Sequence, residues 1–91
     1  MSQSIWYLLA DAKGDPLPGT NATRAFVPAD GIVDDLKNAV WEKNKEADLK
    51  GVSPARLMVY QNKEAKTALE VDDPVEGLGL KKAEAVIIIV P

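Results

Sequence analysis

This 91-residue sequence predicts a two-layer α+β domain, in which one helix packs on one face of a mixed sheet. The first observation behind this prediction is the order of its segments, because several short apolar stretches surround a single stretch with helical spacing. The second is the near-continuous apolarity of residues 85–90, which is typical of a strand at the centre of a sheet. With one helix available, the first and last strands are expected to lie side by side at the sheet centre.

The first two strands are predicted from apolar runs separated by turn-forming residues. Residues 5–10 read Ile-Trp-Tyr-Leu-Leu-Ala, and residues 14–19 are rich in glycine and proline. Residues 23–27 form a second extended run, which Pro28 closes. Because proline cannot donate a hydrogen bond to a neighbouring strand, this second strand is expected at an edge of the sheet.

The helix is predicted over residues 31–45, where the apolar spacing changes to that of a helical stripe. The residues of this stripe are Ile32, Leu36, Ala39, Val40 and Lys43. Asp30 is the expected N-cap residue. Asp34 and Asp35 would lie at the positive end of the helix dipole, where carboxylates are favoured.

The remaining segments complete the order of elements. Residues 56–60 predict a third strand, residues 68–71 a weak fourth strand and residues 85–90 the last strand. The secondary structure of residues 75–80 is left open by the pattern, and a helical turn is one alternative. Two strands, a helix and further strands in this order correspond to the β-grasp arrangement, and a single domain over residues 1–91 is expected.

Composition excludes several functional classes. The net charge is −3 without a run of Lys or Arg, so no nucleic-acid partner is expected. Histidine and cysteine are both absent, which removes the usual general base, thiol nucleophile and zinc ligands. We therefore expect no enzyme activity, cofactor or metal. No apolar run is long enough to span a membrane, and no secretory signal is visible after Met1.

A protein-interaction patch is predicted on the sheet face away from the helix. Alternation along the third strand sends Leu57 and Val59 to the face under the helix and their neighbours to the other face. In the last strand, Val86 and Ile88 are taken to face the helix, so the residues between and after them point away from it. The outward residues are Met58, Tyr60, Ile87 and Ile89. An exposed apolar patch of this kind marks a site for a protein partner or for self-association. The alternative is that a loop or a neighbouring domain covers it. Both tryptophans, Trp6 and Trp41, are expected to pack rather than to bind a ligand.

Several segments resemble the N-terminal ubiquitin-like header of the Crinkler effectors of oomycetes and some fungi. The similar segments are residues 5–9, residues 26–28 leading into 32–40, residues 48–50, and residues 86–90 followed by Pro91. They cover most of the chain in the family's order. The resemblance implies a ubiquitin-like β-grasp fold.

The signature motif of that family is Leu, any residue, Leu, Phe, Leu, Ala, Lys. The matching stretch here is Leu57-Met58-Val59-Tyr60-Gln61-Asn62-Lys63. Leu57 and Lys63 match it, and Val59 and Tyr60 are similar to it. Gln61 and Asn62 depart from it.

The resemblance implies a non-catalytic header that accompanies a secreted effector into a host cell, while a separate C-terminal domain carries the activity. The alternative is a stand-alone ubiquitin-like adaptor that binds protein partners inside the cell that makes it. A covalent modifier is disfavoured, because such proteins act through a terminal Gly-Gly and this sequence ends in Val90-Pro91.

Overall fold

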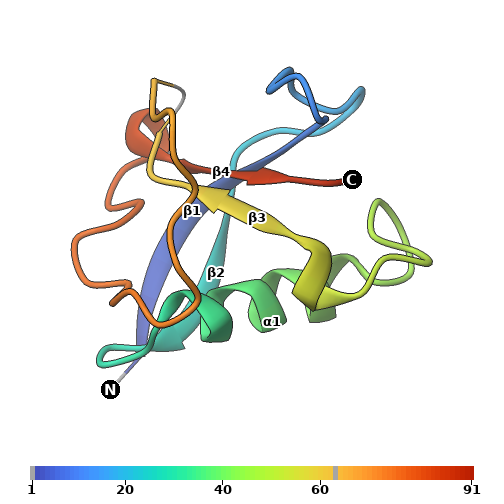
Figure 1. Ribbon diagram of the computed structural model, residues 1–91. Helices are drawn as coiled ribbons and strands as arrows, with labels where there is room; N and C mark the ends of the chain where they lie inside the picture. The colour runs from blue at the N-terminus through green and yellow to red at the C-terminus, as the bar shows by residue number, and fades with distance from the viewer. Residues whose placement is uncertain (1, 63) are drawn as a thin grey trace.

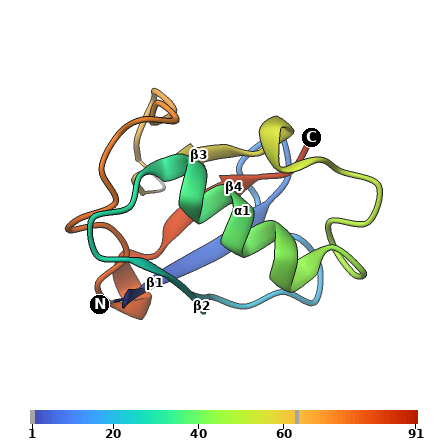
Figure 2. The same ribbon diagram turned by 90° about the horizontal axis from the view of Figure 1, so that it is seen from below.

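Among the residues that the computed structural model of this chain describes, four strands form one mixed sheet and one α-helix packs across one of its faces (Figure 1). The structure describes residues 2–62 and 64–91. The elements are β1 (Ser2–Ala10), β2 (Thr23–Pro28), α1 (Val33–Asn44), β3 (Met58–Tyr60) and β4 (Val86–Ile89). Seen from below, α1 runs across the sheet as a separate layer (Figure 2). The predicted α+β, ubiquitin-like β-grasp architecture is confirmed.

The sheet has the order β2-β1-β4-β3, with β1 and β4 parallel and the other two pairs antiparallel. The first and last strands therefore lie side by side at its centre, and β2 lies at an edge, both as predicted. β4 is bonded on both sides, which explains its unbroken apolar sequence. The strands β1 and β2 pair over six residues, from Ser2 opposite Pro28 to Tyr7 opposite Thr23.

The core lies between the sheet and α1. Alternate residues of β1 and β4, including Ile5, Tyr7 and Ile88, are buried there together with Leu36 and Val40 of the helix. The predicted helical stripe is correct at those two positions and at Ala39, which is partly buried and packs against the core. Val33 and Lys37 are the other buried helix residues, whereas Ile32 is only partly buried and Lys43 is exposed.

The start of α1 differs from the prediction, because Ile32 and not Asp30 is its N-cap residue. Ile32 has an extended backbone, and its N–H group donates to the carboxylate of Asp35 at 2.9 Å. The first two helical N–H groups, of Val33 and Asp34, donate to the carbonyl groups of Asp73 and Val71 at 2.8 and 2.9 Å. A segment distant in sequence thus replaces the expected side-chain cap.

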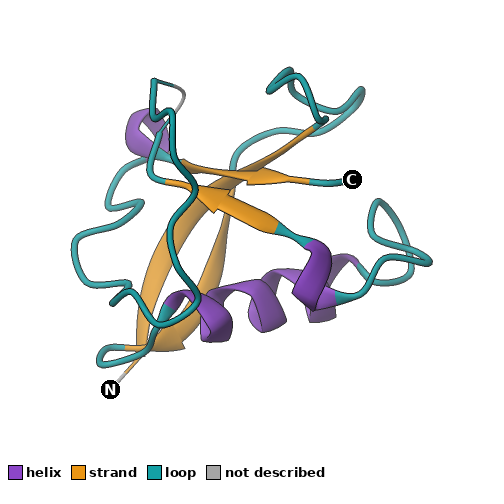
Figure 3. Ribbon diagram, in the orientation of Figure 1, coloured by secondary structure: helices purple, strands orange, loops and turns teal. Residues whose placement is uncertain are grey.

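The predicted fourth strand at residues 68–71 is wrong. Leu69 donates one backbone hydrogen bond to Val59 of β3, at 2.7 Å, and the chain then turns away to meet the start of α1. Figure 3 shows that the described residues between β3 and the last strand are loop except for one short helical turn. That 3-10 turn is Lys82–Glu84, so residues 75–80 are not helical.

Gly79 lets this loop approach β1 closely. Its carbonyl accepts the N–H group of Trp6 at 2.8 Å, and its φ angle is +54°. A Cβ atom there would lie 2.5 Å from the carbonyl oxygen of Trp6 and 2.6 Å from a methyl carbon of Ile5. Only glycine fits this position, which explains the glycine at residue 79.

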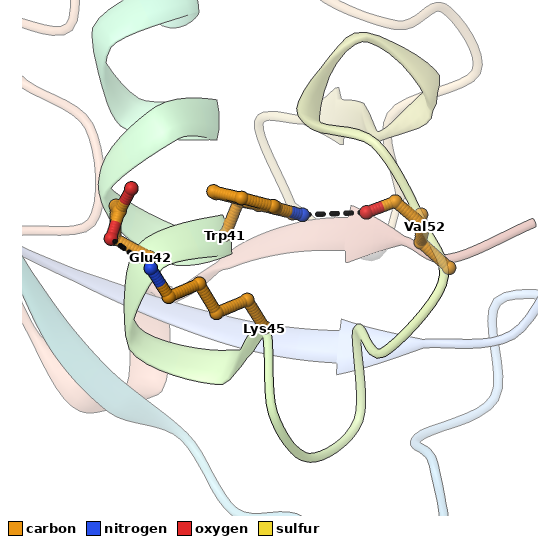
Figure 4. A network of polar contacts seen from close by, with 4 residues as sticks. All are labelled: Trp41, Glu42, Lys45 and Val52. Carbon is orange, nitrogen blue, oxygen red and sulfur yellow. Dashed lines mark hydrogen bonds and ion pairs between the residues drawn. The ribbon is translucent and has the colours of Figure 1, made fainter.

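Trp41 joins the helix to the loop after it (Figure 4). Its side chain packs against the core, as predicted, and its indole N–H donates to the carbonyl oxygen of Val52. The Lys45 ammonium lies 5.3 Å from the centre of the indole ring and 3.0 Å from the Glu42 carboxylate. Both charged side chains are exposed, so this ion pair contributes little stability.

Candidate protein-interaction face

The sheet face opposite α1, called the open face below, carries an apolar row that crosses three strands. It alternates with the buried residues of the same strands, as the period of two requires. Its apolar members are Trp6, Leu8, Met58, Tyr60, Ile87 and Ile89. The strand register places Met58 opposite Ile89, and places Ile87 between Tyr60 on one side and Leu8 on the other. The four residues of the predicted patch are therefore neighbours.

The exposure of these four residues differs. Met58 is 45% exposed, and Tyr60 and Ile89 are partly buried. Ile87 is only 4% exposed, so the expectation that it is an exposed residue is wrong. The cause is the central position of β4, because the side chains on the two neighbouring strands, Leu8 and Tyr60, flank Ile87 from both sides.

All four patch residues line one open groove of about 450 Å³. Ile87 and Ile89 come from β4, while Met58 and Tyr60 come from β3. The loop after β1 contributes residues 12–14, and the loop after β3 contributes Asn62, Ala65 and Lys66. The sequence pattern identified the two strands of this groove but not its loop residues, because no local pattern places those loops over β4.

An aromatic and cationic cluster lies at the other end of the open face. Phe26 of β2 is 64% exposed, and the Arg24 guanidinium lies 5.5 Å from the ring centre of Trp6 and 6.0 Å from that of Phe26. Trp6 lies on the open face and is partly buried there, so it does not pack into the main core. Alternation along residues 5–9 is the signal from which its outward position follows.

The residues of the predicted motif have different environments. Leu57 and Val59 are buried in the core, at 1% and 0% exposure. Tyr60 lines the groove. Lys63 lies outside the described residues. Similarity to the motif thus coincides with core packing at Leu57 and Val59 but not at Tyr60.

Among the titratable groups of residues 2–62 and 64–91, the one with a perturbed pKa lies on the other side of the sheet. Burial raises the pKa of the Tyr7 hydroxyl above its ordinary value of 10.0, and the negative charge of Asp48 adds to this, while a hydrogen bond from the Asn44 side chain opposes it. That hydrogen bond is 2.9 Å long. The arrangement keeps Tyr7 neutral and ties β1 to the end of α1, which is a structural role.

The acidic residues after the predicted fourth strand form a turn. The Asp73 carboxylate accepts the backbone N–H group of Glu70 at 2.7 Å. Within residues 2–62 and 64–91, no three acidic side chains gather as a potential metal site. No helix in the same part of the chain has the length and apolarity needed to cross a membrane.

Comparison with protein-family models finds no match to this chain, and comparison with curated proteins finds none either.

Proposed function

We propose that this chain is a non-catalytic ubiquitin-like interaction domain that binds a protein partner through its open face. One observation carries the proposal: Met58, Tyr60, Ile87 and Ile89 line a single groove that two adjacent strands form. Apolar side chains that remain accessible on a small domain are typical of interaction sites. The groove offers apolar contact area, and the sequence contains no histidine or cysteine, which favours binding over catalysis.

The proposal is tested by placing a charge in the groove. Met58→Asp and Ile89→Asp are expected to abolish partner binding or self-association without unfolding the domain, because neither residue is fully buried. Val71→Asp is the matched control, since Val71 is 49% exposed and does not line the groove. Circular dichroism checks the fold, while affinity capture and analytical ultracentrifugation measure association. If both groove variants behave like the control, the open face is not the interaction site.

For the biological setting, we propose the delivery header of a secreted Crinkler-type effector that enters host cells. The support is the resemblance in residues 5–9, 32–40 and 86–91 and in the motif at residues 57–63. The domain fused to a fluorescent reporter is expected to leave the producing cell and to appear in host cells. Retention of the reporter in the producing cell would remove the delivery role, while leaving the interaction role intact.

The alternative setting is an adaptor that acts inside the producing cell through the same face. The two settings differ in the coding sequence downstream of the domain. A catalytic domain encoded after Pro91 favours the delivery header, and a stop codon directly after Pro91 favours the adaptor.

A further inference from the structure

The charged side chains that line the groove are all positive. Three of its lining residues are cationic: Lys13, from the loop after β1; Arg56, from the 3-10 turn Pro54–Arg56; and Lys66, from the loop after β3. No carboxylate stands among the described side chains that line it. The whole sequence has more acidic than basic residues, 14 against 11, so a rim with three cationic side chains and no acidic side chain departs from the average surface.

These cations are available to a ligand. The ion pair identified within residues 2–62 and 64–91 joins Lys45 to Glu42, away from the groove. The nearby carboxylate of Asp11 accepts the backbone N–H groups of Lys13 and Asp15, at 2.8 and 3.1 Å. Those bonds shape the loop, and Figure 1 shows this loop, in blue, standing over the same end of the sheet as the C-terminus. Asp11 thus positions Lys13 beside the groove.

We propose that this groove binds a peptide segment of a partner protein in which acidic residues flank apolar ones. Apolar side chains of the peptide would cover Met58 and Ile89, and its carboxylates would meet Lys13, Arg56 and Lys66. Removing apolar surface from water supplies affinity, and complementary charge supplies orientation and discrimination. The proposal rests on the interaction role of the open face and specifies the chemistry of the partner.

Two other occupants fit the groove less well. A second copy of this chain in a symmetric contact would bring its own three rim cations against the first set, which like-charge repulsion disfavours. A nucleic acid would pair the cations but leave the apolar floor without a matching surface, and the net charge of −3 repels it at long range.

The test compares three labelled peptides of equal length: one of alternating Asp and Leu, one of alternating Lys and Leu, and one of alternating Asp and Ser. Binding is followed by NMR on protein carrying its tag at the N-terminus, because Pro91 lines the groove. We expect the Asp-Leu peptide to shift the amide signals of Met58, Ile87 and Ile89. The other two peptides are expected to bind at least about tenfold more weakly, equivalent to ~1.4 kcal/mol.

Charge reversal supplies the matched control. Lys66→Glu is expected to lower the affinity of the domain for the Asp-Leu peptide several-fold. It should also reduce the salt dependence of this binding. Lys50→Glu makes the same change in net charge at an exposed loop residue outside the groove, and is expected to leave binding unchanged. Both lysines are exposed, so neither variant should unfold the domain.

Several results would overturn this inference. Equal binding of the Lys-Leu peptide, or equal effects of the two charge reversals, would show that the rim does not select acidic partners. The inference also fails if none of the peptides shifts the amide signals of the groove residues at about 1 mM. It fails likewise if duplex DNA shifts these signals, or if they shift when the protein alone is diluted. The Met58→Asp capture experiment uses no peptide, so it judges the interaction role separately.

Discussion

The two faces of the sheet are built from the same strands but have opposite environments. On the face under α1, Ile5, Val59 and Ile88 have no exposed surface. On the open face, their neighbours Trp6, Met58 and Ile89 are all partly accessible. At these three pairs of positions, a shift of one residue along a strand thus separates a side chain that holds the fold from one that is accessible to a partner. Adjacent substitutions should therefore have very different costs.

The largest difference is expected within β4. Ile88→Ala should lower the free energy of unfolding by about 3–4 kcal/mol, because it leaves a cavity in the core. Ile89→Ala should cost about 1 kcal/mol, since that side chain is only partly buried. Urea denaturation followed by circular dichroism measures both values. Equal losses would mean that the two faces contribute alike to stability.

The next largest effect is expected where the loop meets β1. Gly79→Ala should cost about 2–3 kcal/mol, because its new methyl group would meet the backbone of Trp6 as well as a positive φ angle. Gly77→Ala is the control, with a φ of +82° but no atom within 4 Å of the added Cβ, and should cost about 1 kcal/mol. Thermal unfolding of both variants separates the clash from the conformational strain.

On the face under α1, Tyr7 should make the stability of the domain depend on pH. Tyr7→Phe should lower stability at neutral pH by about 1 kcal/mol, because the hydrogen bond with Asn44 is lost. The pKa of the Tyr7 hydroxyl is higher in the folded state than its ordinary value of 10.0. The stabilisation that the neutral hydroxyl contributes is therefore fully present below pH 10.0 and falls as the pH rises toward the folded-state pKa. The wild type should therefore lose more stability above pH 10 than the Phe variant. Urea denaturation at pH 7 to 11 measures this, and parallel pH curves would contradict it.

The smallest effect is expected on the open face itself. Phe26→Ser should change the free energy of unfolding by no more than about 0.5 kcal/mol, because the ring is 64% exposed. Val27→Ala, one residue along β2 and 2% exposed, should cost clearly more. Chemical denaturation compares the two. A loss for Phe26→Ser as large as that for Val27→Ala would show that the open face is part of the core.

The helix illustrates the limit of local patterns. Its period located Leu36 and Val40, since residues that share a face of a helix recur at fixed spacing. The sequence pattern placed the start of the helix too early. The first N–H groups of α1 donate to the carbonyl groups of Val71 and Asp73, which lie about forty positions downstream, and no local pattern shows this. The same contact draws residues 70–75 away from the sheet, which is why the expected fourth strand is absent from the described structure.

The sequence by itself determined the fold class, the central place of β1 and β4, and which strand residues face α1, because these follow from alternation, helical spacing and the number of layers that must be covered. Only the tertiary structure decided that flanking strands bury Ile87, that Gly79 meets Trp6, and that Lys13, Arg56 and Lys66 surround one groove. These contacts join residues far apart in the chain, so no local pattern encodes them. The interaction face was thus predictable as a set of strand residues, while the charge around it depends on the folded arrangement of three loops.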